Sequence, residues 1–168
     1  MRKKILVTGG AGFIAGALIK RLLNEENNII HNIDKISYKN GLNRINEFNK
    51  NHRHIHYAID LKNKELLIDL FEEINPDVIF HLAAESHVDV SLSNPEQFIQ
   101  SNIVGTFNLL EATRIYMKKL TSLKRESFKF IHISTDEVFG SLGSMGKFNE
   151  NSNYNPRSPY SASKASAD

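Results

Sequence analysis

Two adjacent carboxylates lie near the end of the chain in the motif STDEVFG, directly behind a short apolar run at residues 128–133. Asp136 and Glu137 therefore stand where a buried strand is expected to leave its sheet, and they could form a pair of catalytic groups. A structural alternative exists: Ser134 or Thr135 caps a short helix, and the two acids are favourable in its first turn. The motif alone leaves both interpretations open.

A glycine-rich turn, GGAGFIAG, separates a strand-like run from a segment of helical period near the N-terminus. Such a turn lets the backbone approach a pyrophosphate, which then lies at a helix N-terminus. Gly9 and Gly12 have suitable spacing, and Asp34 follows about twenty residues later, where it can bind an adenosine ribose. A tight turn without a ligand is the alternative. In this context we predict an NAD site; Asp34 favours NAD over NADP, although Lys35 weakens that preference.

The motif SPYSASK supplies a second candidate catalytic pair. Ser158 followed by Pro159 predicts a helix start, so Tyr160 and Lys164 lie four residues apart on one helical face. A free tyrosine has a pKa of about 10. A nearby ammonium, helped by an oxidised nicotinamide, would stabilise the phenolate and make Tyr160 a usable acid/base. Thr135 could add a third hydroxyl, although the Y-x-x-x-K pattern alone is also common at ordinary helix starts.

Strand-length apolar runs alternate with segments of helical period along the whole chain. We expect strands at residues 5–7, 29–33, 54–59, 78–82 and 128–133, and helices through residues 14–22, 66–74 and 98–117. Before the last of these helices, Pro95 at the first helical position and Gln97 two residues later predict a capping box. This alternation predicts an α/β fold with a doubly wound parallel sheet, as one domain over residues 1–168.

The composition excludes several classes of protein. The chain has 168 residues, 24% of them charged, and a formal net charge of +2, which does not suggest a nucleic-acid partner. It has no cysteine, and it shows neither a signal peptide nor a membrane span, so we expect a cytoplasmic protein. His52, His54 and His56 alternate and could share one strand face, but no carboxylate has suitable spacing, so we predict no metal site.

These motifs together resemble the extended short-chain dehydrogenase/reductase family, and within it the dTDP-glucose 4,6-dehydratases. Two of the matching stretches, HLAAESHVD and STDEV, are typical of this branch, whereas the glycine turn and Y-x-x-x-K belong to the whole superfamily. The matches cover the chain from end to end: VTGGAGFI, DKIS, HLAAESHVD, NIVGT, STDEVFG and SPYSASKAS.

The resemblance implies a Rossmann-type fold and a three-step reaction on a nucleotide sugar, a step of rhamnose biosynthesis. NAD takes a hydride from sugar C4 while Tyr160 accepts the hydroxyl proton. Glu137 then removes the C5 proton, Asp136 protonates the departing C6 hydroxyl, and the hydride returns to C6. Thr135 holds the C4 oxygen, and Ser86 faces both sugar and cofactor. The residues implied at the NAD site are Gly9, Gly12, Phe13, Ile14, Asp34, Lys35, Ile36, Ser37, Asp60, Leu61, Leu82, Ala83, Ala84, Ser86, Ser101, Tyr160 and Lys164.

The chain departs from the family pattern in four respects, the first of which is Tyr38-Lys39-Asn40-Gly41, where the family usually has tyrosine-alanine-glycine-asparagine. Val90 stands where the family usually has arginine, and Phe139 replaces a usual tyrosine, which we expect to be a packing change. The chain also stops at Asp168, within the helix that carries Tyr160 and Lys164. We therefore expect a C-terminally truncated NAD-binding domain without the substrate-nucleotide domain, with impaired activity, an unpaired strand edge and a homodimeric state. A non-catalytic NAD-binding module or remnant, or a related UDP-sugar dehydratase, epimerase or decarboxylase, is the alternative.

Overall fold

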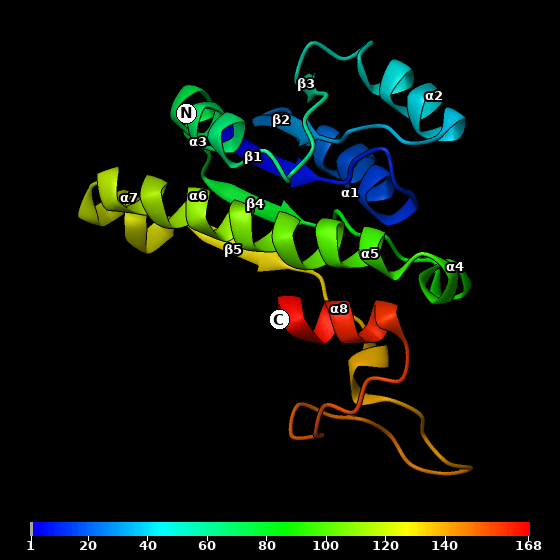
Figure 1. Cartoon of the computed structure of the whole chain (residues 1–168). Helices are drawn as coiled ribbons and strands as arrows, with labels where there is room; N and C mark the ends of the chain where they lie inside the picture. Colours follow the sequence, from blue (N-terminus) through cyan, green and yellow to red (C-terminus); the bar gives the residue numbers. More distant parts are fainter. Residues whose placement is uncertain (1) are drawn as a thin grey trace.

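A five-stranded parallel sheet forms the centre of the computed structural model, which describes residues 2–168 (Figure 1). The strand order is β3-β2-β1-β4-β5, and every neighbouring pair is parallel. The order reverses between β1 and β4, which makes their C-terminal ends the place where ligands of such sheets bind. The strands are β1 (Lys3–Thr8), β2 (Asn28–Ile33), β3 (His54–Tyr57), β4 (Val78–His81) and β5 (Lys129–His132).

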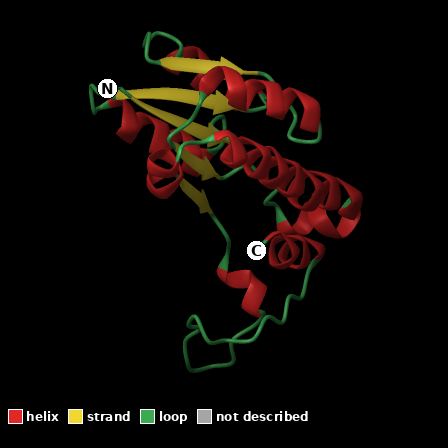
Figure 2. Ribbon diagram, turned by 90° about the vertical axis from the view of Figure 1, so that its left-hand side faces the viewer, coloured by secondary structure: helices red, strands yellow, loops and turns green. Residues whose placement is uncertain are grey.

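Helices cover both faces of the sheet, which confirms the predicted doubly wound α/β fold (Figure 2). One face is covered by α1 (Phe13–Leu23) and α2 (Lys39–Phe48), and the other by α3 (Lys64–Ile74) and α6 (Gly105–Lys119). The remaining helical segments are α4 (Val88–Ser93), α5 (Pro95–Phe98), the π-helix η1 (Ile99–Val104), α7 (Ser122–Ser127), the 3-10 helix η2 (Asp136–Phe139) and α8 (Pro159–Ala167).

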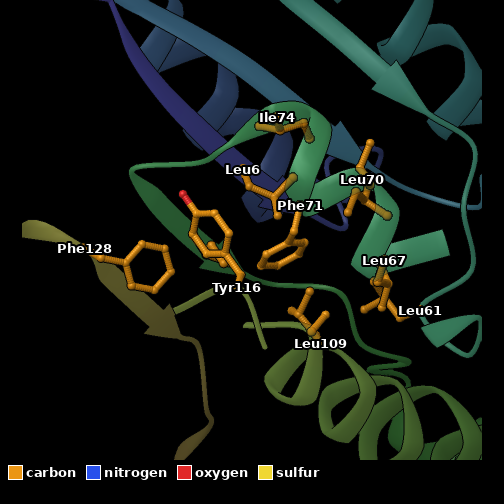
Figure 3. Close-up of a cluster of buried hydrophobic side chains, with 12 residues drawn as sticks. Leu6, Leu61, Leu67, Leu70, Phe71, Ile74, Leu109, Tyr116 and Phe128 are labelled. Carbon is orange, nitrogen blue, oxygen red and sulfur yellow. The ribbon is translucent and has the colours of Figure 1, made fainter. Parts of the chain in front are cut away.

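The alternation of β1 side chains builds two cores from one strand. Leu6 points to the α3/α6 face, where it joins Phe71, Leu109 and Tyr116 (Figure 3). The residues on either side of Leu6 point the other way and pack with Ala15 and Ile19 of α1. Because both faces are covered, the strand is apolar at every one of these positions, as a doubly wound sheet requires.

The predicted capping box before the long helix is wrong. Asn94 makes no side-chain cap; its amide instead donates to Gln97 Oε1 at 2.9 Å. The reason is that α4, which the sequence did not predict, ends at this point. The Asn94 backbone N–H already donates to Val90 O at 2.9 Å, so Gln97 has no free N–H to satisfy. The predicted single helix is accordingly divided into α5, η1 and α6.

The two edge strands differ in their surroundings. In β3, both ring nitrogens of His54 have partners, Asn49 and Asn32, and His56 Nε2 donates to the Asp34 carbonyl. His52 lies before the strand, and within residues 2–168 no group of three histidines or acids could hold a metal ion. None of the helices described over those residues has the length and apolar character needed to cross a membrane.

The other edge, β5, has an unpaired side and an incompletely covered face, as predicted. It pairs with β4 alone in the described part of the chain. Ile131 is 36% exposed and Ile133 38%, although Phe130 on the opposite face packs into the α3/α6 core. Both β3 and β5 are thus edge strands, and β5 also has an incompletely covered face.

Candidate functional site

A cavity of about 620 Å³ lies at the C-terminal edge of the sheet. Residues that follow each of the five strands line it, together with Tyr160 and Lys164 from α8. It brings together the residues expected at the NAD site with one exception, Ile36. The others on its wall are Gly9, Gly12, Phe13, Ile14, Asp34, Lys35, Ser37, Asp60, Leu61, Leu82, Ala83, Ala84, Ser86 and Ser101. Glu85, within the expected range 82–86, also lines it, and lining residues that were not expected at the NAD site are Ile33, Tyr38, Ile59, His87, Ile133 and Ser134.

The glycine turn forms the floor of the cavity and has the properties of an anion cradle. Gly9 has φ +77°, and a Cβ there would lie 2.7 Å from the Ala83 Cα, so only glycine fits without strain. Gly12 is the N-cap of α1, and this helix has neither a side-chain cap nor an acid in its first turn. The N–H groups that open α1 therefore remain available to a phosphate.

Asp34 fastens the turn to the end of β2. Its Oδ2 accepts a bond from the Ala11 N–H at 2.9 Å, and its Oδ1 accepts one from the Ile36 N–H at 2.7 Å. A carboxylate has about four acceptor positions, so two remain for ribose hydroxyls. Ile36 has φ 50° and does not line the cavity; the expectation that it lines the NAD site is not supported. Tyr38 donates to the Ala11 carbonyl at 2.8 Å and so completes this corner.

Lys35 is directed across the cavity mouth. Its Nζ lies 3.3 Å from Glu85 Oε1 and 3.4 Å from Ser101 Oγ. The cation therefore has a carboxylate partner on the β4 loop. This pairing reduces the attraction for a 2′-phosphate that the sequence suggested, and the preference for an unphosphorylated ribose rests on Asp34.

A buried hydrogen-bond chain behind the cavity holds the ends of β1 and β4 together. Thr8 Oγ1 accepts from the N–H groups of Leu82 (3.2 Å) and Ala83 (3.1 Å), so its own hydrogen is donated to His81 Nδ1 at 2.7 Å. His81 Nε2–H in turn donates to Thr106 Oγ1 at 2.9 Å. Burial lowers the pKa of His81 to about 3, and His132 and Lys164 add to this effect. The neutral ring thus fixes the close approach of Ala83 to the glycine turn.

Asn102, a buried residue of the π-helix η1, joins the β4 loop to α8. Its Oδ1 accepts from the Glu85 N–H at 2.8 Å, and its Nδ2 donates to the Glu85 carbonyl at 3.0 Å and to Ser163 Oγ at 2.9 Å. These hydrogen bonds fix the position of α8 relative to the β4 loop that lines the cavity. The motif NIVGT contains this asparagine but by itself indicates no role for it.

Tyr160 and Lys164, both from α8, line the cavity together with Ile133 and Ser134. Burial raises the pKa of Tyr160, a hydrogen bond with Thr135 opposes the shift, and the charges of Glu137 and Asp136 add to it. Lys164 Nζ donates to the Ile133 carbonyl at 2.7 Å. The expectation that the lysine lowers the pKa of Tyr160 is therefore not met by the chain alone, because burial outweighs the favourable contacts.

The acidic pair occupies η2, and the predicted helix cap is confirmed. Thr135 is the N-cap, and its Oγ1 accepts from the Glu137 N–H at 3.3 Å. Asp136 and Glu137 are exposed and lie just beyond the cavity wall, near enough to Tyr160 to influence its pKa. Gly140 ends the turn with φ +89°, where a Cβ would lie 2.4 Å from the Asn155 carbonyl oxygen. The cap does not exclude a chemical role, since both acids face open space beside Tyr160.

Two departures from the family pattern have distinct surroundings. Phe139 packs against Phe148 and Tyr154, with ring centroids 5.3 and 5.4 Å apart, which confirms a packing role. Val90 lies on α4 and is half exposed, with no contact in the structure that explains it.

Comparison with known proteins gives consistent relatives. Residues 6–168 match the family model described as GDP-mannose 4,6 dehydratase. The dTDP-glucose 4,6-dehydratase of Neisseria meningitidis serogroup B is 47% identical over 167 residues, which are 99% of this chain and 47% of that protein. The Haemophilus influenzae dTDP-glucose 4,6-dehydratase is 46% identical over 164 residues, which are 97% of this chain and 48% of that protein.

Solved structures show the same relationship. The dTDP-glucose 4,6-dehydratase of Bacillus anthracis in complex with NAD has a TM-score of 0.81 at 36% identity, covering 98% of this chain and 48% of that one. The UDP-Glc/GlcNAc 4-epimerase of Campylobacter jejuni has a TM-score of 0.82 at 28% identity, covering 98% and 46%. The chain thus spans about half the length of the relatives it matches.

Proposed function

Because the chain belongs to the GDP-mannose 4,6 dehydratase family, we propose that it is the NAD-binding, catalytic-residue-bearing part of a dTDP-glucose 4,6-dehydratase. The observation that carries the proposal is the convergence of the glycine cradle with Tyr160 and Lys164 around one cavity, with Thr135 and the acidic pair outside its wall but close enough to influence the pKa of Tyr160. We further propose that residues 1–168 are the NAD-binding domain and that the segment gripping the substrate nucleotide is not among them.

The cavity residues fit a dinucleotide at three points. The open N-terminus of α1 and the Gly9 turn suit a pyrophosphate, because they offer N–H groups and no side chain stands in the way. The free acceptor positions of Asp34 suit the adenosine ribose. Bound NAD would supply a hydride acceptor for sugar C4 and return the hydride at C6.

Tyr160, Thr135 and the acidic pair then transfer the protons. Tyr160 accepts the proton of the C4 hydroxyl, and Thr135, the N-cap residue of η2, holds the C4 oxygen. Glu137 removes the C5 proton and Asp136 donates a proton to the C6 hydroxyl, which leaves as water. Neighbouring positions on one turn of η2 give the two acids different directions, as two reacting atoms require.

The alternative enzyme is a sugar-nucleotide 4-epimerase, because epimerase structures match this chain with a TM-score of 0.82. An epimerase needs Tyr160 and the cofactor but no elimination acid. The acidic pair on η2 therefore favours the dehydratase.

The direct test is to incubate the complete gene product with NAD and dTDP-glucose. We expect a dTDP-4-keto-6-deoxyglucose product, identified by mass as loss of one water. dTDP-galactose without water loss would support the epimerase instead. Titration calorimetry of residues 1–168 with NAD separates these enzymes from a non-catalytic remnant, for which no heat of binding is expected.

We also propose a homodimer formed by the helices that follow β4. Ile99, Ile103, Phe107 and Leu110 recur at helical spacing along η1 and α6, and three of them are exposed. Such an apolar stripe suits packing against its own copy across a two-fold axis. A cytoplasmic location and a role in rhamnose biosynthesis are parts of the same proposal, and both depend on the dehydratase assignment.

Replacing Gly9 with alanine is expected to weaken NAD binding by about 10- to 100-fold, since a left-handed non-glycine residue costs about 1–3 kcal/mol. The added Cβ would also lie 2.7 Å from Ala83 and move the cradle. Calorimetric titration measures the change. Gly143→Ala is the matched control, because a Cβ there meets nothing within 4 Å. Equal affinity of both variants would show that the turn does not hold the cofactor.

A further inference from the structure

A carboxylate at the C-cap of α8 follows Lys164 in the chain and is not among the residues that line the cavity. Asp168 accepts hydrogen bonds from His132 Nε2 (3.0 Å), from the Ser134 hydroxyl and from the Tyr154 hydroxyl (3.0 Å). Its side chain is only 12% exposed. Two of these donors belong to the end of β5, so the carboxylate ties that strand end to the last turn of α8, which lies beneath it in Figure 1.

The ring of His132 lies between Asp168 and Lys164, and its contacts define its protonation state. Nε2 donates to Asp168 and therefore carries the hydrogen, while Nδ1 is buried with no partner among residues 2–168. A second ring proton would lack an acceptor and would add a cation 3.5 Å from Lys164 Nζ. Burial and the Lys164 charge lower the pKa of His132, and Asp168 opposes them. The ring is accordingly neutral, and the pair with Asp168 carries one negative charge.

Lys164 needs such a charge. Its residue is 5% exposed, and its Nζ has one strong acceptor, the Ile133 carbonyl at 2.7 Å. His132 Nε2 cannot accept from it, because that nitrogen donates to Asp168. Burial lowers the pKa of Lys164, and the charge of Asp168 opposes that shift. The other titratable group facing His132, His81 from β4, is neutral and supplies no compensation.

We propose that Asp168 is a positioning residue for Lys164: with His132 it holds the end of β5 against α8 and keeps the lysine an ammonium beside Tyr160. The contacts of Asp168 and its effect on the charge of Lys164 do not depend on the proposed function; only the importance of that charge for catalysis does. The contacts that carry the proposal connect residues on β5, on the loop before α8 and on α8 itself, so no local motif predicts them.

The test is to measure the protonation of Lys164 directly, by ¹⁵Nζ NMR titration of the full chain, with Lys164→Arg used to assign the resonance. Removal of an opposite charge disfavours the ammonium, so Asp168→Asn is expected to lower the Lys164 pKa by about one unit. Asp168→Glu keeps the charge, so its Lys164 pKa should be close to that of the unmodified chain. Asp69→Asn on the exposed face of α3 is the matched control. An unchanged Lys164 pKa in Asp168→Asn would overturn the proposal.

A second measurement on the unmodified chain keeps the proposal testable if Asp168→Asn does not fold. Histidine ¹⁵N NMR at neutral pH should show His132 as the neutral Nε2–H tautomer. An imidazolium or an Nδ1–H tautomer there would contradict the assigned chain of contacts.

Activity then distinguishes this proposal from the proposed function. In the complete protein, Asp168→Asn should shift the alkaline limb of the kcat profile to lower pH by the same amount as the Lys164 pKa, with KM for the nucleotide sugar unchanged. If the unmodified protein makes no product but the Lys164 pKa shifts as expected, the dehydratase assignment fails and Asp168 keeps its role. If the protein is active and the pKa does not move, only the role of Asp168 fails.

Discussion

A Tyr160→Phe variant of the complete protein is expected to lose dehydratase turnover by about 10²- to 10⁴-fold, the usual contribution of a general base. The phenol is the group that accepts the C4 hydroxyl proton, and phenylalanine keeps the ring that packs edge-on against Phe98. NAD affinity should therefore change little. Steady-state turnover of dTDP-glucose and calorimetric titration with NAD measure the two effects.

Tyr116→Phe is the matched control for this experiment. This change also removes a tyrosine hydroxyl, which donates to Asn75 Oδ1 at 2.6 Å and to the Pro76 carbonyl at 2.8 Å. Tyr116, however, lies in the α3/α6 core and not at the cavity, so the variant tests the loss of a hydroxyl elsewhere. It should lower the melting temperature without reducing turnover of the folded protein. Retained turnover in Tyr160→Phe would rule out the phenol as the base.

Glu137→Gln is expected to block the loss of water by about 10²- to 10⁴-fold while C4 oxidation continues. Glutamine keeps the length of the side chain and the cap of η2, because Thr135 accepts from the backbone N–H of this residue and not from its side chain. The cofactor should then accumulate in its reduced form. Rapid mixing with detection of reduced-nicotinamide absorbance, together with quenched-flow mass analysis of the sugar, separates the two steps.

The control for Glu137→Gln is the same change at an exposed glutamate. Glu150 lies in the loop after η2 and is exposed, so Glu150→Gln should leave both steps unchanged. Equal loss of oxidation and elimination in Glu137→Gln would argue that the residue positions η2 rather than acting as the C5 base.

Much of the site could be predicted because parallel strands place their C-terminal ends at one edge. Gly9, Asp34, Asp60 and Leu82 each follow a strand, and the cavity gathers all four. The helix start that local capping rules predicted at Ser158 and Pro159 is confirmed, and a capping box is present there in the structure. The same rules were wrong at Asn94, because an unpredicted helix had already satisfied its N–H.

The interpretation of the acidic pair shows where local sequence stops being sufficient. The cap by Thr135 and the short helix are confirmed, whereas the roles of Asp136 and Glu137 remain predictions that depend on the position of the substrate. Their nearness to Tyr160 comes from the return of the chain through residues 141–157, not from any spacing in the motif.

The sequence by itself determined the five strands and their alternation with helices, the glycine turn with its acidic partner, and the identity of the groups that could move protons. Only the tertiary structure decided which buried polar groups support them. Thr8 bonds His81 across 73 positions of the chain. Asn102 bonds Glu85 across 17 positions and Ser163 across 61, and Asp168 bonds His132 across 36. Periodicity and capping act over three or four residues, so contacts of this range follow from how β1, β4, β5 and α8 pack together.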